Sequence, residues 1–211
     1  MTKRLVTLLA LLILTVMFSP VAKADQIVIQ LNTSNADASN PWTTPTGNFG
    51  TVTFTLVGDD IQVSIQLAAG YTLISDGVGW NWGGSGAAPT ISVSLPAGLS
   101  LAYGGVPQTG NQLHMDGFGN FMYAVTAPNV GQGGGGNSVT FTIEGAYTSA
   151  QQFVAPNASG FDVALHVYNS NSTATNKTGY VTGTIVTPEP GSLTLLLLGA
   201  GALLLGARRK R

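Results

Sequence analysis

The chain has 211 residues, with 8 Lys and Arg, 9 Asp and Glu, 28 Gly, 10 Pro and no Cys. This length predicts one domain with at most short appendages, and the lack of cysteine excludes a disulfide framework, a thiolate metal site and a cysteine nucleophile. Only 8% of the residues are charged, against about 25% in an average soluble domain, and the net charge of −1 averages over three unlike segments.

The first segment, residues 1–24, has the three regions of a secretory signal peptide. Lys3 and Arg4 make its start positive, and an apolar run follows them. Ala22 and Ala24 supply the small residues that signal peptidase requires at its cleavage site. We therefore expect an exported protein, with signal peptidase as a partner.

The second segment, residues 25–187, alternates apolar and polar side chains with a period of two. Such alternation gives a strand one face for a core and one face for water. Gly58, Asp59 and Asp60 predict a hairpin turn between the second and third strands. In chain order, the predicted strands lie near residues 27–31, 51–56, 61–67, 91–95, 121–125, 139–143, 161–167 and 181–185.

The fold class follows from this pattern. No window of residues 25–187 has a helical period, and the connections between strands are too short for crossover helices. Short strands with one polar face favour an all-β, antiparallel β-sandwich, jelly-roll-like in the first place and immunoglobulin-like as the alternative. We expect this sandwich to fill residues 25–187, between the signal peptide and a C-terminal transmembrane helix within residues 188–211.

The charge of the sandwich domain excludes one class of partner. Eight acidic residues and one basic residue, Lys177, give it a net charge of −7. Nucleic acid is therefore not expected as a partner, because phosphate binding needs clustered Lys and Arg. The outward strand positions are mostly Thr, Ser, Gln and Asn, which keep an exported sheet soluble or present a polar, matrix-facing or glycosylated surface.

Trp80 and Trp82 form the most suggestive pair in this domain. Two residues apart in an extended segment, they face the same side, and two neighbouring indoles could stack on sugar rings. Trp42 and Tyr71 are further candidates for glycan binding. The alternative is that both indoles cap the core, since large aromatic side chains dominate core burial.

Residues suited to catalysis or metal binding are sparse. His114 lies near Asp116, and His166 shares an outward strand face with Asp162, which is about 13 Å away along a strand and too far to ligate the same metal. Neither a Gly-x-Ser-x-Gly nor a His-Glu-x-x-His motif is present, and these are the motifs of serine hydrolases and zinc peptidases. We predict no catalytic residue, no metal and no cofactor.

The third segment combines a short motif, an apolar run and a basic end. The apolar run, residues 191–207, would cover roughly 25 Å as a helix, which is near the lower limit for crossing a bilayer. The terminal cations are costly in hydrocarbon, so we expect them to stay on the cytoplasmic side while the inner membrane holds the chain in transit. The motif is Pro188, Glu189 and Pro190, and the basic end is Arg208, Arg209, Lys210 and Arg211.

In order, spacing and position, these three parts resemble a PEP-CTERM sorting signal. The resemblance covers residues 188–211 and implies a Gram-negative bacterial protein whose tail an exosortase recognises and removes. It also implies an association with exopolysaccharide, extracellular matrix or biofilm. A Gram-positive sorting signal would need a Leu-Pro-x-Thr-Gly motif before the apolar run, and none is present.

These expectations combine into three functional hypotheses. The first is an exported, non-enzymatic protein of the cell surface or extracellular matrix. The alternative is a carbohydrate-binding module of the same fold that recognises exopolysaccharide through Trp80 and Trp82. The third is an extracellular glycoside hydrolase, which would need a pair of carboxylates flanking the scissile bond.

Overall fold

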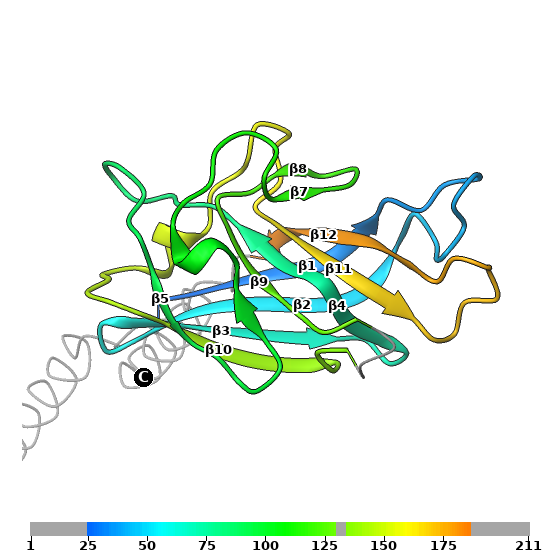
Figure 1. Cartoon of the computed structure of the whole chain (residues 1–211), viewed down its shortest axis with the longest axis horizontal. Helices are drawn as coiled ribbons and strands as arrows, with labels where there is room; N and C mark the ends of the chain where they lie inside the picture. Colours follow the sequence, from blue (N-terminus) through cyan, green and yellow to red (C-terminus); the bar gives the residue numbers. More distant parts are fainter. Residues whose placement is uncertain (1–24, 130–133, 187–211) are drawn as a thin grey trace, which may run out of the picture.

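A computed structural model describes residues 25–129 and 134–186, which are built almost entirely of strands (Figure 1). The predicted signal peptide and the predicted C-terminal helix lie outside these residues, and none of the helical segments described is long and apolar enough to cross a membrane. The strands are β1 (Gln26–Ser34), β2 (Thr46–Val57), β3 (Asp60–Leu67), β4 (Tyr71–Trp80), β5 (Ser92–Ser94), β6 (Ser100–Leu101), β7 (His114–Met115), β8 (Gly119–Asn120), β9 (Tyr123–Thr126), β10 (Ser138–Glu144), β11 (Val163–Asn169) and β12 (Thr178–Val186). Two 3-10 segments within the described ranges are η1 (Ala102–Gly105) and η3 (Ala150–Phe153).

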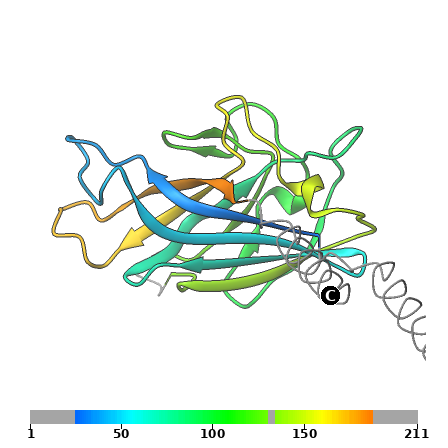
Figure 2. The same ribbon diagram turned by 180° about the vertical axis from the view of Figure 1, so that it is seen from behind.

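Ten of these strands form one sheet, in the order β5-β10-β3-β2-β1-β12-β11-β4-β9-β6, and β7 and β8 pair separately. The sheet folds over, so that β4, β9 and β11 lie over β1, β2 and β3, as Figures 1 and 2 show from opposite sides. Its two edges meet where the Ile91 N–H donates to the Gly105 carbonyl oxygen at 3.0 Å. The predicted all-β, antiparallel class is confirmed, but one nearly closed sheet replaces the two separate sheets of the predicted sandwich.

A bend across three strands explains how a single sheet can fold over. Leu31 of β1 pairs with Gly50 of β2 on one side and with Gly183 of β12 on the other, and the register of β1 shifts just after this row. A Cβ atom at Gly183 would overlap the Gln30 carbonyl oxygen, so only glycine fits there. Bulges and glycines increase local twist and bending, and strand periodicity alone does not reveal where they act.

Most predicted strands are present, and the period-two pattern sets their burial. In β3, the apolar residues at 61, 63, 65 and 67 are buried, whereas Gln62 and Gln66 between them are exposed. The predicted hairpin joins β2 to β3, with Val57 paired to Asp60 and a φ of 64° at Gly58. The sequence patterns missed β4, β6, β7 and β8, whose apolar residues are interrupted by Gly, Asp and Asn or are too few to form a repeat.

The core lies between the two layers of the folded sheet. Trp80 of β4 packs on Phe141 of β10 with ring centres 5.8 Å apart, and Phe49 of β2 meets Tyr71 of β4 edge-on at 5.6 Å. A smaller apolar cluster lies outside the sheet, where the β7–β8 hairpin covers β11. Fully burying a large apolar side chain contributes roughly 1.5–3 kcal/mol, so these clusters stabilise the fold without disulfides.

Candidate functional site

The structure separates the two tryptophans that were predicted to form one sugar-binding platform. Trp80 is 0% exposed and stacks on Tyr123 with ring centres 6.0 Å apart. A sugar ring cannot reach it, so the two-indole platform is not formed and the core alternative applies to Trp80. Trp82 is half-buried, packs edge-on against Phe153 at 5.2 Å and lines a surface hollow. Trp80 thus belongs to the core, whereas Trp82 packs at the margin of the core, beside the hollow.

The other two aromatic candidates are also structural. Trp42 is 0% exposed, and its indole Nε1 donates to the Asn35 Oδ1 at 3.0 Å. The Tyr71 hydroxyl is 2.7 Å from the Thr43 hydroxyl and its ring packs on the core. Of the four aromatic residues considered, only Trp82 borders the hollow.

The hollow has a volume of about 390 Å³ and lies where four segments of the chain meet. It is lined by residues 81–82 after β4, 108–110 before the β7–β8 hairpin, 120–122 at the end of this hairpin and just beyond it, and 156–158. The apolar lining residues are Trp82, Phe121, Met122, Pro156 and Ala158, and the polar side chains belong to Asn81, Gln108, Thr109, Asn120 and Asn157. No lining residue has an ionisable side chain. A volume of roughly 300–1,000 Å³ is typical of small-molecule sites.

Asn81 holds the walls of the hollow together. It is 4% exposed, its Nδ2 donates to the Ala155 carbonyl oxygen at 3.2 Å, and its Oδ1 accepts from the Met122 N–H at 3.0 Å. The Gln108 N–H donates to the Met122 carbonyl oxygen at 2.9 Å, which ties the remaining wall to the same residue. Buried polar groups with satisfied hydrogen bonds are rigid, so the hollow is preformed.

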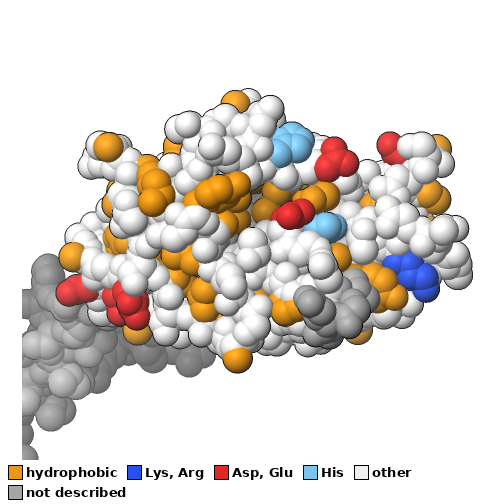
Figure 3. All heavy atoms as spheres, in the orientation of Figure 1, with side chains coloured by type: hydrophobic (Ala, Val, Ile, Leu, Met, Phe, Trp, Pro, Cys, Tyr) orange, Lys and Arg blue, Asp and Glu red, His pale blue; other side chains and the backbone are white. Residues whose placement is uncertain are grey.

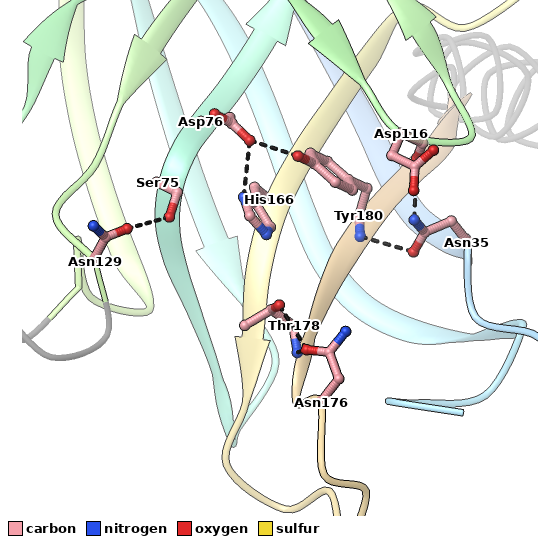
Figure 4. A network of polar contacts seen from close by, with 9 residues as sticks. All are labelled: Asn35, Ser75, Asp76, Asp116, Asn129, His166, Asn176, Thr178 and Tyr180. Carbon is pink, nitrogen blue, oxygen red and sulfur yellow. Dashed lines mark hydrogen bonds and ion pairs between the residues drawn. The ribbon is translucent and has the colours of Figure 1, made fainter. Parts of the chain in front are cut away.

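A second polar group lies on the outer face of β4, β11 and β12 (Figure 4). Residues 74–77 of β4 bulge opposite His166 of β11, because the register shifts between Leu165 and Val167. His166 Nδ1 lies 3.1 Å from Asp76 Oδ2, and the same oxygen accepts from the Tyr180 hydroxyl at 2.5 Å. The imidazole stacks on the Tyr180 ring with centres 4.3 Å apart. The partner of His166 is therefore Asp76, from a distant part of the chain.

These contacts shift the pKa values of the group. The hydrogen bond from His166 lowers the pKa of the Asp76 carboxyl, the bond from Tyr180 lowers it further, and partial burial opposes both. Burial and the Asp76 carboxylate raise the pKa of the Tyr180 hydroxyl. Ser75, beside Asp76, has a φ of 45°, and its hydroxyl donates to Asn129 Oδ1 at 2.5 Å. The hydrogen bonds of Asp76 with His166 and Tyr180 thus join β4, β11 and β12 at the bulge.

The remaining candidates are dispersed over the surface. His114 Nδ1 lies 2.8 Å from Asn120 Oδ1, across the β7–β8 hairpin. Asp60 accepts from the Gly145 N–H at 2.9 Å, and Glu144 accepts from the Ser92 hydroxyl at 3.1 Å. Within residues 25–129 and 134–186, no three His, Asp or Glu side chains lie close enough to hold a metal ion.

Of the polar residues of the hollow, Asn81 lies between the two tryptophans and is the one that the sequence brings to attention as a hydrogen-bond partner for a sugar. Gln108 and Asn157 come from loops and Asn120 from the two-residue strand β8, all without periodicity or motif, and only tertiary structure brings them to Trp82. No local signal could have found them.

The residues predicted to direct sorting lie outside the described ranges. They are Ala22, Ala24, Pro188, Glu189, Pro190, Arg208, Arg209, Lys210 and Arg211. The described chain does show where the two ends of the body, residues 25–187, leave the fold. Val186 of β12 pairs with Val28 of β1. The chain thus enters and leaves the sheet at the same end.

Comparison with known proteins assigns the C-terminal segment. Residues 186–211 match the family model described as the PEP-CTERM protein-sorting motif. No curated protein and no solved structure matches the chain.

Proposed function

We propose that this chain, which carries the PEP-CTERM sorting motif at residues 186–211, is a non-enzymatic protein of the cell surface or extracellular matrix. The motif implies export, membrane-associated sorting in a Gram-negative bacterium and processing by an exosortase. In this proposal, signal peptidase removes residues 1–24, the inner membrane holds the tail transiently, and tail removal delivers the body to a matrix that contains exopolysaccharide. The sorting motif is the observation that carries the proposal.

The surface of the body supports a place in a hydrated matrix. On the face shown in Figure 3, charged side chains are few and are separated by neutral surface. On the outer side of the sheet, Gln30 Nε2 donates to Asn48 Oδ1 at 3.0 Å, and Asn32 Nδ2 donates to the Thr184 hydroxyl at 3.2 Å. Amides and hydroxyls of this kind can exchange hydrogen bonds with polysaccharide hydroxyls as readily as with water.

The position of the two chain ends supports the sorting route. β1 and β12 are adjacent and antiparallel, and Ile29 pairs with Ile185 near the point where the described chain begins and ends. The segments before β1 and after β12 can therefore reach one membrane at the same time while the body between them is folded. Removal of either segment breaks no strand pairing of the described sheet.

Fractionation of cells with and without an exosortase tests this proposal. In the strain with the exosortase, we expect the body in the extracellular fraction, and in the strain without it we expect the chain in the membrane fraction. Glu189→Ala in the motif should shift the protein toward the membrane, whereas Glu144→Ala, a matched change at an exposed position of the body, should not. The same distribution in all four samples would contradict the proposal.

A second candidate function is carbohydrate binding to the same exopolysaccharide. The hollow beside Trp82 favours it, since an aromatic side chain and several amides converge there. Trp80 no longer contributes, because it is buried. The lining of the hollow contains no carboxylate, so it offers no acid–base pair for glycoside hydrolysis.

A further inference from the structure

We infer that the hollow beside Trp82 binds a sugar residue of an uncharged polysaccharide, an inference that rests on the carbohydrate-binding function proposed above. Its volume of about 390 Å³ admits a sugar ring but is open to the surface, as a site for one unit of a long polymer must be. The occupant is identified by three properties of the lining: an apolar side, unused hydrogen-bonding groups and the absence of charge.

The apolar side suits the C–H face of a sugar ring. Trp82, Phe121, Met122 and Pro156 all border the hollow. Phe121 is 2% exposed and belongs to the apolar cluster under the β7–β8 hairpin, so it supports the hollow from below, while the half-buried Trp82 and Met122 and the exposed Pro156 are left for contact with a ligand. Rigid aromatic and aliphatic side chains lose little entropy when a ring packs on them.

The polar side retains hydrogen-bonding capacity for hydroxyl groups. Within the described ranges, the Thr109 hydroxyl and the Gln108 Oε1 have no hydrogen-bond partner, since Gln108 uses only its Nε2, on the Val106 carbonyl oxygen at 2.7 Å. Asn120 Nδ2 gives one N–H to Asn111 Oδ1 at 2.8 Å, and an amide nitrogen has two N–H donors. Both donors and acceptors are therefore available, as the two-way hydrogen bonding of a sugar hydroxyl requires.

The charge of the site selects uncharged polymers. No Lys or Arg lines the hollow, and the body carries a net charge of −7 with Lys177 as its one basic residue. An acidic polysaccharide would be repelled by this charge and would find no cation to pair with. A neutral sugar meets no such penalty.

The hollow also needs no rearrangement before it binds. The buried amide of Asn81 bridges Ala155 and Met122, and Asn157 Nδ2 donates to the Phe118 carbonyl oxygen at 2.7 Å. A preformed site avoids the ordering cost that weakens the binding of flexible loops.

Affinity electrophoresis of the processed protein tests the inference directly. The full chain is expressed in a host with an exosortase, and the mature protein is run through native gels that contain dextran, galactomannan or hydroxyethylcellulose as uncharged polymers, or alginate as an acidic one. We expect at least one uncharged polymer to retard the protein and alginate not to. Retardation by alginate alone, or by no polymer, overturns the inference.

Matched variants locate the binding. Ala158→Trp places an indole in the hollow and should abolish retardation, whereas Ala38→Trp, at an exposed position far along the chain from the lining residues, should leave it unchanged. Circular dichroism checks that both variants fold. If Ala158→Trp does not fold, Thr109→Trp takes its place, with Thr140→Trp on the outer face of β10 as the matched control. Equal retardation of a hollow variant and its control would overturn the inference.

Tryptophan fluorescence provides an independent readout of the same site. Trp42 and Trp80 are 0% exposed, so a change in emission when the retarding polymer is added reports on Trp82. Trp82→Phe should remove this change, and its persistence would count against the site. A protein that is released into the matrix but binds no polymer would refute the inference and leave the proposed surface or matrix role standing.

Discussion

Replacing Trp80 with alanine tests the assignment of this indole to the core. Trp80 is 0% exposed and packs on Tyr123 and Phe141, at 6.0 and 5.8 Å between ring centres. Truncation of a buried aromatic side chain costs about 3–5 kcal/mol, and the two aromatic contacts of Trp80 place it at the upper end of this range. The indole Nε1 has no hydrogen-bond partner among the described residues. Removing this unpaired polar group offsets about 1 kcal/mol of the lost stability. We expect a net loss of about 4 kcal/mol in the free energy of unfolding.

Urea unfolding followed by far-ultraviolet circular dichroism measures this loss. With a slope near 2 kcal/mol per M, a loss of about 4 kcal/mol lowers the midpoint by roughly 2 M. Trp82→Ala is the matched control and should lower the midpoint by less than half as much, because Trp82 is only half-buried. A Trp80→Ala midpoint equal to or above that of Trp82→Ala would refute the reasoning.

Two further predictions concern the bulge of β4. A Cβ at Gly77 would overlap the Val125 carbonyl oxygen, whereas a Cβ at Gly58, which has nearly the same φ, meets open space. Gly58→Ala should therefore lower the free energy of unfolding only by the left-handed backbone strain of about 1–2 kcal/mol. Gly77→Ala should lower it clearly more. Equal decreases in the calorimetric melting temperature would contradict this. The lowered pKa of Asp76 means that its ionised form stabilises the fold above the unfolded-state pKa of about 3.9, and that this stabilisation is lost as the pH falls through the folded-state value. Asp76→Asn should thus be less stable than wild type near pH 7, and this difference in urea midpoint should shrink as the pH falls below about 3.9. A difference that does not depend on pH would contradict the prediction.

Local chemistry made much of the fold predictable. The alternation in β3 and the Gly58 turn depend on neighbouring residues alone, and the structure has both as the sequence predicts. The sorting motif is equally local, since its three parts follow one another within residues 186–211. Features of this kind need no knowledge of which strands pair.

Contacts between residues far apart in the sequence account for the features that could not be predicted from it. The partner of His166 is Asp76, 90 positions away, and it reaches His166 only because β4 bulges at Gly77. Likewise, Gly50 and Gly183 pair with Leu31 from opposite sides, at the row where the register of β1 shifts. An aromatic residue at a strand position fits a core or a surface platform equally well, so the spacing of the two tryptophans could not reveal that Trp80 is buried while Trp82 lies beside the hollow.

The hollow is the clearest example of this limit. Its amides at Gln108 and Asn157 lie in loops and that of Asn120 lies in β8. Gln108 is hydrogen-bonded to Met122, Asn120 to Asn111 and Asn157 to Phe118. None of these residues belongs to a repeat or motif, so their convergence follows from the fold rather than from any segment of it.

The central claim is that only the folded middle of the chain persists outside the cell, after both ends have been removed. Mass spectrometry with terminal sequencing, performed on the protein recovered from the extracellular fraction, tests it most directly. We predict an N-terminus at Asp25 and a C-terminus close to the Pro188–Pro190 motif. Recovery of an extracellular form that still ends in Arg208–Arg211 would contradict the account.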